Sequence, residues 1–407
     1  MKLSRRSVLT AATAASLPLI RPARAQTASL KIGVLNDQSG PYMNTGGLTS
    51  VACVKQAVED FGSHGFNVEV ITADHQNKPD LASSITRQWF DRDGVDMLID
   101  VPTSSVALAL QSICKEKNKV YINSGAASSA LTGEQCSPNF IHWTYDTYML
   151  GKSTGGAMVK AGGDSWYFLT ADYAFGKQLQ ADTTGFITAA KGTVKGASRY
   201  PFPDTSDFSS FLVQAQASGA KVLGLANAGA DTVNSIKQAH EFGLNQTMKI
   251  AALLMFITDV HALGLNAASG LTLTESFYWD LNDRTRAFTK RVLPKTPNNY
   301  PNMIHAGCYS GALHYLKAAA AMGGAAAAKK DGVATINKMK SMEVDDDCFG
   351  KTKIRVDGRN LVPAYLFEVK KPAESKKPWD YYKLVATTPG DEAFRPLAEG
   401  HCPFVKA

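Results

Sequence analysis

The sequence predicts an α/β fold made of two successive units, each a doubly wound parallel sheet. Two observations support this prediction. From residue 29, short apolar stretches alternate with longer amphipathic ones, which is the pattern of strands separated by crossover helices. The alternation starts again after about residue 146, and the chain of 407 residues is long enough for two or three domains.

The first unit is expected to begin with the apolar stretch LKIGVLN. Its predicted strands are residues 30–36, 67–73, 95–101 and 119–124, and its predicted helices are residues 49–62, 80–94 and 104–118. Each helix is amphipathic and lies between two apolar stretches, so the strands are expected to be parallel and covered on both faces.

The second unit repeats this order. Its predicted strands are residues 165–171, 194–202, 220–227 and 249–254, with helices from residue 176, over 208–219 and over 232–243. Residues 271–280 read as a strand that leaves this unit, and residues 302–330 as mainly helical. Two short strands, 353–360 and 363–371, are expected to complete either unit or to bridge both.

The first 25 residues are expected to be an export signal. They combine a basic start, a short apolar run over residues 8–20 and the cleavage pattern Ala23-Arg24-Ala25, so the mature chain should begin near Gln26. The pair Arg5-Arg6 resembles a twin-arginine signal, with a plain secretory signal as the alternative. The predicted location is the periplasm.

Charge and cysteine usage narrow the function further. The signal carries five basic residues and no acid, so removing it lowers the net charge from +7 to +2. The sequence contains no basic run with interleaved aromatic residues, which is the pattern typical of nucleic-acid binding. Among six widely spaced cysteines we expect a disulfide between Cys136 and Cys402, both in loops that contain proline, and buried thiols at Cys53, Cys114 and Cys308.

No catalytic, metal or cofactor site can be assembled from the sequence. The stretch LGKST resembles a phosphate-binding loop, but Asp146 stands where the motif needs glycine, and Asp345 does the same before FGKTK. No serine-nucleophile or zinc-binding motif occurs, and the eight histidines are scattered. We therefore expect a protein that is not an enzyme and that uses no cofactor.

Hydroxyl and small residues follow two predicted strands of the first unit. The turn Thr103-Ser104-Ser105 ends one strand, and NSGAASSALT (residues 123–132) ends the next. Ligands bind outside the carboxyl ends of strands in doubly wound sheets, where helix N-termini can bind a carboxylate without arginine. The turn is thus a candidate anion site. The alternative is that Thr103 or Ser104 only caps its helix.

Several stretches in order along the chain resemble the periplasmic binding proteins of branched-chain amino-acid-type ABC importers. They are KIGVLNDQSGPYMNTGG, TADHQNKPDLA, TSS, NSGAASSALT, TADYAFGKQL, FPDTSDFSSFL and QAHEFGL. The resemblance covers essentially the whole mature chain. It implies two lobes of the periplasmic-binding-protein type I fold joined by three hinge crossings, with lobe 1 at 28–144 plus 276–335 and lobe 2 at 145–275 plus 336–407.

The resemblance also implies where a ligand would bind in the cleft between the lobes. The family's contacts fall on Tyr42 or Thr45, Ser104, Ser105, Gly125, Ala126, Ala127, Phe175, Asn227 and Met255. Thr103 belongs to the candidate anion site, and Tyr145 and Tyr173 are further candidate lining residues. The alternative for the aromatic side chains is that several belong to the core.

Three of these positions depart from the amino-acid-binding pattern. Ala127 replaces a threonine that binds the ligand ammonium, Phe175 replaces a tyrosine, and the residues around Met255 contain no acid. An unpaired buried ammonium costs several kcal/mol. Among the branches of the family, the chain most resembles the one that binds aromatic carboxylates, through the stretches HWTYDT, TADYAFG and DHQNK.

The predicted function is therefore a monomeric periplasmic receptor that captures a small organic acid of the benzoate or phenylpropanoid type for membrane permease subunits. One alternative is a receptor for branched-chain or other amino acids or amides. A second alternative is a ligand sensor that docks a signalling partner. A secreted hydrolase would need an activated nucleophile, which the sequence does not reveal.

Overall fold

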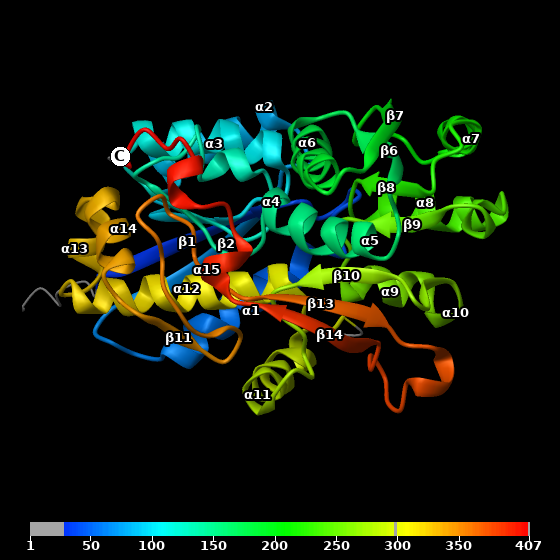
Figure 1. Cartoon of the computed structure of the whole chain (residues 1–407). Helices are drawn as coiled ribbons and strands as arrows, with labels where there is room; N and C mark the ends of the chain where they lie inside the picture. The colour runs from blue at the N-terminus through cyan, green and yellow to red at the C-terminus, as the bar shows by residue number, and fades with distance from the viewer. Residues whose placement is uncertain (1–27, 297–298, 406–407) are drawn as a thin grey trace, which may run out of the picture.

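Two parallel sheets form the cores of two lobes in the computed structural model, which describes residues 28–296 and 299–405. The predicted export signal, residues 1–25, lies outside the described residues. Figure 1 shows the first lobe in blue and cyan and the second lobe in green beside it. The predicted fold class is confirmed.

The first sheet has the strand order β2-β1-β3-β4-β5, and every neighbouring pair is parallel. Its strands are β1 Ser29–Asn36, β2 Asn67–Asp74, β3 Met97–Asp100, β4 Val120–Asn123 and β5 Phe140–His142. The helices between them are α1 Gly47–Phe61, α2 Pro79–Gln88 with a π-helical turn at Trp89–Asp93, and α3 Ser104–Glu116. All residues of β3 and β4 are buried, because helices cover both faces.

The second sheet has the order β7-β6-β8-β9 and is also parallel. Its strands are β6 Ser165–Ala171, β7 Thr193–Tyr200, β8 Val222–Ala226 and β9 Lys249–Ala252. The helices of this lobe are α4 Thr147–Leu150, a π-helical turn at Gly151–Gly155, α5 Gly156–Lys160, α6 Ala174–Ala189, α7 Ser209–Ala217, α8 Ala230–Glu241, α9 Ile257–Leu263 and α10 Leu265–Ala268.

The last third of the chain adds an antiparallel sheet and helices that return to the first lobe. The strands are β10 Thr272–Glu275, β13 Ala364–Val369 and β14 Tyr382–Thr388, with a separate hairpin of β11 Val344–Asp346 and β12 Gly350–Thr352. The helices are α11 Asp283–Val292, α12 Met303–Ala321, α13 Ala325–Lys330, α14 Gly332–Lys340 and α15 Gly390–Ala393. Short 3-10 turns occupy Ser129–Leu131, Leu244–Gln246, Leu293–Lys295, Pro372–Glu374 and Leu397–Glu399.

The structure places part of this last segment differently from the predicted division. Helix α12 packs along α1, and α14 contacts β4, so both lie on the first lobe. Ile336 and Met339 of α14 are fully buried, and they hold the helix on the first lobe. The predicted division had assigned residues from 336 onward to the second lobe. The antiparallel sheet of β10, β13 and β14 instead contacts the second lobe, where Thr274 Oγ1 lies 2.8 Å from Thr154 Oγ1.

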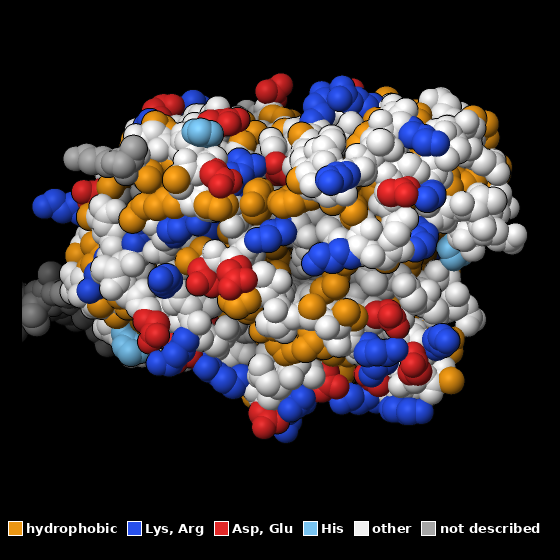
Figure 2. All heavy atoms as spheres, viewed as in Figure 1, with side chains coloured by type: hydrophobic (Ala, Val, Ile, Leu, Met, Phe, Trp, Pro, Cys, Tyr) orange, Lys and Arg blue, Asp and Glu red, His pale blue; other side chains and the backbone are white. Residues whose placement is uncertain are grey.

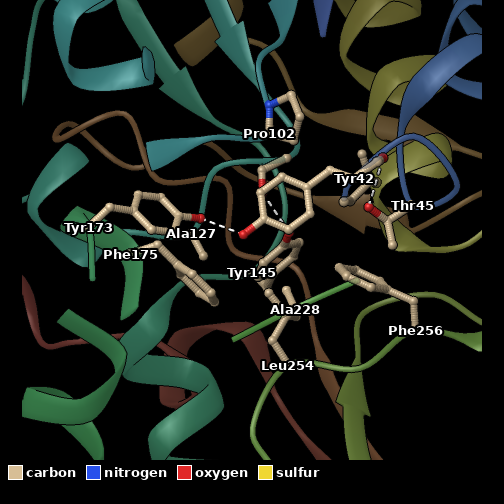
Figure 3. Close-up of a pocket in the computed structure, with 12 residues that line it drawn as sticks. Tyr42, Thr45, Pro102, Ala127, Tyr145, Tyr173, Phe175, Ala228, Leu254 and Phe256 are labelled. Atoms are coloured by element: carbon tan, nitrogen blue, oxygen red, sulfur yellow. Dashed lines mark hydrogen bonds between the residues drawn. The ribbon is translucent and has the colours of Figure 1, made fainter. Parts of the chain in front are cut away.

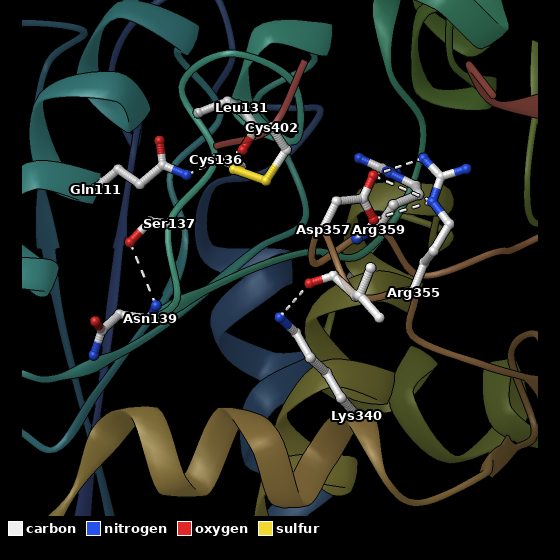
Figure 4. Close-up of a disulfide and its surroundings, with 11 residues drawn as sticks. Gln111, Leu131, Cys136, Ser137, Asn139, Lys340, Arg355, Asp357, Arg359 and Cys402 are labelled. Carbon is white, nitrogen blue, oxygen red and sulfur yellow. Dashed lines mark hydrogen bonds and ion pairs between the residues drawn. A yellow bond between two sulfur atoms is a disulfide. The ribbon is translucent and has the colours of Figure 1, made fainter. Parts of the chain in front are cut away.

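A disulfide joins Cys136 of the first lobe to Cys402, with the two Cα atoms 5.6 Å apart (Figure 4). The Gln111 amide supports the Cys136 loop by donating to the Leu131 carbonyl at 3.1 Å. The remaining cysteines are buried free thiols at Cys53, Cys114, Cys308 and Cys348. The C-terminal tail is therefore tied to the first lobe, and not to the second lobe as the predicted division implied.

The surface shows no strong single-sign field on the face drawn in Figure 2, where lysine and arginine side chains are interspersed with aspartate and glutamate. Within residues 28–296 and 299–405, no helix is long and apolar enough to cross a membrane. In the same part of the chain, no group of three or more histidine, cysteine, aspartate or glutamate side chains could hold a metal ion.

Replacing both Cys136 and Cys402 by serine is expected to lower the free energy of unfolding by about 2–5 kcal/mol, because the disulfide closes a long loop in the unfolded chain. Denaturant unfolding with and without reductant measures this effect. Reductant should destabilise the parent protein and leave the double variant unchanged. Equal stability of the two proteins under oxidising conditions would contradict the structural role of this disulfide.

Candidate ligand-binding cleft

The loops at the carboxyl ends of four central strands meet between the lobes. In each sheet the strand order reverses beside the first strand of its lobe, between β1 and β3 and between β6 and β8. Such a reversal leaves a crevice in which doubly wound proteins bind ligands. The loops after these strands carry Tyr42 and Pro102 in the first lobe and Tyr173 and Ala228 in the second.

These loops meet around a small cavity of about 10 Å³, which has room for about one water molecule in this closed arrangement (Figure 3). Its lining consists of aromatic, aliphatic and hydroxyl-bearing residues: Tyr42, Thr45, Pro102, Gly125, Ala127, Tyr145, Tyr173, Phe175, Ala228, Leu254, Phe256 and Ile304. None of these lining side chains is charged. Tyr42, Thr45, Gly125, Ala127, Tyr145, Tyr173 and Phe175 were among the predicted site residues.

The hydroxyl groups of the lining are all hydrogen-bonded within the protein. The hydroxyls of Tyr42 and Tyr173 lie 2.6 Å apart and join the two lobes across the cleft. The Tyr145 hydroxyl donates to the Gly125 carbonyl at 2.6 Å, and Thr45 donates to the Tyr42 carbonyl at 3.1 Å. Burial raises the pKa of Tyr42 and Tyr145 well above the usual range, so these phenols are neutral at physiological pH.

Aromatic rings close the cleft from both sides. Phe202 of the second lobe stacks on Tyr173, with ring centroids 4.4 Å apart, and on Tyr42 at 5.3 Å. Tyr145 meets Phe256 edge to face at 5.8 Å. Flat apolar surfaces in these orientations suit a planar ring as a further partner.

Asp37 shapes the loop that carries Tyr42. Its carboxylate accepts the backbone N–H groups of Gly40 and Tyr42, each at 2.8 Å. The Asn77 side chain donates to the same carboxylate at 2.7 Å and accepts a hydrogen bond from the Thr103 hydroxyl. Thr103 therefore lies behind the cavity wall and holds Asn77, and it makes no side-chain cap on α3.

Ser104 is fully buried at the first position of α3. Its hydroxyl oxygen accepts the backbone N–H groups of Ala127 and Ser128, each at 3.2 Å. Ser104 therefore joins the Thr-Ser-Ser turn, which is our candidate anion site, to the turn that follows β4. The next residue, Ser105, is only partly buried. Ala126 is held by its carbonyl, which accepts a hydrogen bond from His142 at 2.6 Å.

Six predicted contact residues do not line the cavity: Thr103, Ser104, Ser105, Ala126, Asn227 and Met255. The Asn227 side chain accepts from Thr232 at 2.8 Å and donates to Ser235 at 3.1 Å, so it organises the start of α8. Met255 is fully buried in the core, and its neighbours Leu254 and Phe256 line the cavity instead. Along extended chain, adjacent side chains point to opposite sides, so an error of one residue moves the contact out of the cavity.

Several buried acids near the cleft were missed by the sequence reasoning, and Asp100 and Asp231 are two of them. Asp100, just before the Thr-Ser-Ser turn, accepts from Asn36 at 2.9 Å and from Ser124 at 3.1 Å. Its backbone φ of 82° is unusual for a residue other than glycine. A Cβ atom at Gly125 would lie 3.0 Å from its carboxylate, so Asp100 stands directly behind the lining. Burial raises the pKa of Asp100.

Asp231 is the second buried acid, and it lies in the first turn of α8. It accepts a hydrogen bond from the Tyr200 hydroxyl at 2.8 Å. Burial raises the pKa of Asp231 to about 7. The signal that could have identified it is its position just after a strand end, three residues beyond Ala228 of the lining.

A backbone contact holds the lobes together at the cleft. The N–H of Ala230, the first residue of α8, donates to the Pro41 carbonyl of the first lobe at 3.0 Å. Gly229 has a φ of 60°, and a Cβ atom there would lie 2.5 Å from the Pro41 carbonyl oxygen. Only glycine permits this close approach. Because the hydrogen bond joins the two lobes, the cleft is closed at this edge.

Two parallel-sheet lobes that close over a small cavity at the ends of their strands define a solute-binding protein. The chain belongs to the periplasmic binding protein family, whose model matches residues 29–376. The predicted family is thus confirmed. Family membership places the protein in the periplasm and among proteins that bind substrates for transport.

Comparisons with individual proteins agree with this assignment. A periplasmic binding protein from Burkholderia mallei is 48% identical, with a TM-score of 0.89, covering 94% of this chain and all of that one. The Leu/Ile/Val-binding protein homolog 4 of Brucella abortus is 23% identical over 95% of both chains. An ABC transporter solute-binding protein from R. palustris, solved with benzoate, is 22% identical with a TM-score of 0.77, covering 89% and 97% of the two chains.

The substitution Ala230→Pro is expected to open the cleft. Proline is tolerated at the first position of a helix, but it lacks the N–H that donates to Pro41. Small-angle scattering should show a larger radius of gyration than for the parent protein, with an unchanged helical circular-dichroism signal. Ala230→Gly, which keeps the N–H, is the matched control. Identical scattering of all three proteins would contradict this role of the contact.

Buried acids around the cleft are expected to make stability fall as the pH rises from about 6.5 to 8. Burial raises the pKa of Asp259 to about 7 and that of Glu275 to about 8, as it does for Asp231. The folded protein therefore binds more protons than the unfolded chain in this range, so raising the pH favours unfolding.

Below pH 6.5 buried histidines oppose this trend, because burial lowers the pKa of His75 to about 4 and that of His305 to about 3. Thermal unfolding across pH 5–8.5 measures the profile, and Asp259→Asn should flatten the decline above pH 6.5. A stability that rises throughout this range would contradict the assignment.

Proposed function

We propose that the protein is the solute receptor of an ABC importer and that it captures a small aromatic carboxylate of the benzoate or phenylpropanoid type. The observation that carries this proposal is the cavity lining, which offers aromatic faces and hydroxyl groups and no charged side chain. The receptor makes and breaks no bond. Closure of the lobes presents the ligand to the permease subunits in the membrane.

The ligand carboxylate binds beside Ser104, which is fully buried here and becomes accessible past Gly125 and Ala127 of the lining when the cleft opens. The backbone N–H groups of Ala127 and Ser128 converge on the Ser104 hydroxyl oxygen, where they face the N-terminus of the long helix α3. A helix N-terminus with free N–H groups favours negative charge. The hydroxyl hydrogen of Ser104 is not used in these two bonds, so it can be donated to a carboxylate oxygen.

The ring of the ligand lies among Tyr42, Tyr145, Phe175 and Phe256. These side chains come from both lobes, and each of them lines the cavity. Offset and edge-to-face packing adds about 0.5–1.5 kcal/mol per aromatic pair beyond the burial of apolar area. A ring substituent can meet the paired hydroxyls of Tyr42 and Tyr173, which can both donate and accept. The benzoate complex of the R. palustris protein supports the capacity of this fold for such a ligand.

A branched-chain amino acid is the second candidate ligand, because the Brucella abortus relative is named for leucine, isoleucine and valine. Its ammonium would need a partner, and Asp231 is the acid that could reach it once the Tyr42–Tyr173 contact opens. Asp231 is however engaged by Tyr200, and Asp100 lies behind Gly125 with both oxygens hydrogen-bonded. An aromatic acid carries no ammonium group, so it leaves no cation unpaired at the lining, and it is therefore the preferred ligand.

The remaining parts of the proposal concern export and partners. The signal of residues 1–25 directs export by the twin-arginine route, with cleavage near Ala25, and the mature receptor acts as a monomer. A sensor protein in place of the permease would use the same closed lobes. A permease gene beside the gene for this chain would favour transport.

A thermal-shift screen followed by calorimetry tests the ligand class. Benzoate and 4-hydroxycinnamate are expected to raise the melting temperature, and leucine is expected to leave it unchanged. Ser104→Ala should weaken binding of the aromatic acid by about 1–3 kcal/mol, because it removes a donor to the carboxylate. Ser112→Ala, at an exposed position of the same helix, is the matched control. Micromolar leucine binding without any response to aromatic acids would refute the proposed ligand.

A further inference from the structure

We propose that Glu275 is a positioning residue that sets the distance between the two walls of the ligand cleft. The residue ends β10, at the point where the chain leaves the second lobe, and its side chain is fully buried. It does not line the cavity. The inference rests on the proposed function only in that it concerns the same cleft.

The carboxyl group of Glu275 accepts hydrogen bonds from three separate segments. One oxygen accepts the backbone N–H of Ile257 at 2.9 Å and the hydroxyl of Tyr382 at 2.8 Å. The other oxygen accepts the backbone N–H of Met303 at 3.2 Å. Both carboxyl oxygens therefore bind a backbone N–H, and the two N–H groups belong to different lobes.

These two N–H groups stand next to residues that form the cavity. Ile257 begins α9 and directly follows Phe256, which lines the cavity from the second lobe. Met303 begins α12 and directly precedes Ile304, which lines it from the first lobe. One buried side chain thus fixes the backbone beside a lining residue on each wall.

Neighbouring side chains add hydrogen bonds within each lobe, but these bonds do not cross from one wall to the other. On the second lobe, Asp259 accepts the backbone N–H of Phe256 at 3.0 Å. On the first lobe, Asn302 accepts the N–H of Ile304 at 2.9 Å and donates to the carbonyl of Thr45, another lining residue, at 3.0 Å. Glu275 is the group that connects these two sets of hydrogen bonds.

The substitution Glu275→Gln tests this role because an amide nitrogen cannot accept a hydrogen bond. Ile257 and Met303 donate to different oxygens, so in either orientation of the amide the NH₂ group faces one of these N–H groups, and one wall loses its contact. We expect the affinity for the ligand to fall about tenfold, the effect of losing one buried hydrogen bond. Glu275→Asp keeps both oxygens but shortens the side chain, and it should also weaken binding.

Tyr382→Phe is the matched control. It removes the third hydrogen bond to the same carboxyl group while leaving both wall contacts in place. It is expected to lower the melting temperature with less than a twofold change in affinity. In a Phe256→Ala background, the effect of Glu275→Gln on affinity should shrink, because the positioned side chain is then absent.

Affinity is measured by calorimetry with benzoate and with leucine, and the probe that binds the parent protein serves for the variants. Binding of leucine alone refutes the proposed ligand and still tests Glu275. Wild-type affinity in both Glu275→Gln and Glu275→Asp refutes the positioning role and leaves the ligand class intact.

Hydrogen exchange of the ligand-free proteins gives a readout that needs no ligand. Glu275→Gln should speed exchange in the segments around residues 255–258 and 302–305 together, whereas Tyr382→Phe should leave both protected. Faster exchange confined to residues near 275 would overturn the proposal.

Discussion

The contact on which the cleft depends is the one between the Pro41 carbonyl and the N–H of Ala230, because it brings the strand ends of two separate sheets to one cavity. Each lobe buries its own parallel sheet. The loops at the strand ends are ordered by hydrogen bonds within each lobe, such as that of Asp37 to the Tyr42 N–H, and contacts with the opposite lobe bring them together. Gly229 allows the contact, and Tyr42, Tyr173 and Phe202 add ring stacking beside it.

Polar residues behind the lining give the cavity its shape, while the lining itself stays uncharged. Asp37 orders the loop of Tyr42, Ser104 joins two turns, and Glu275 ties α9 to α12. Buried polar groups of this kind are stable only when their hydrogen bonds are satisfied, so they restrict the backbone to one arrangement. This separation lets the ligand meet aromatic faces on a scaffold whose positions are set by hydrogen bonds.

Periodic patterns in the sequence predicted both parallel sheets, because strands buried on two faces are continuous apolar runs such as residues 165–171. The family resemblance implied much of the cavity, including Tyr42 and Phe175. Phe256 and Ile304 could not be predicted, because their positions depend on how irregular chain enters α9 and α12. Asp100 was visible next to the Thr-Ser-Ser turn, but its burial follows from tertiary packing alone. The same holds for α14, whose lobe is decided by contacts distant in sequence.

The state of the cysteines makes the protein suitable for site-specific labelling. Two cysteines are consumed by the disulfide, and the other four are buried, with burial raising the pKa of Cys53 and Cys114. A cysteine introduced at Met43, which is 47% exposed and adjacent to Tyr42 at the rim of the cavity, would be the accessible thiol for a fluorescent dye. The dye would sense the docking of this loop on the second lobe, so the receptor can be converted into an optical sensor of its own ligand.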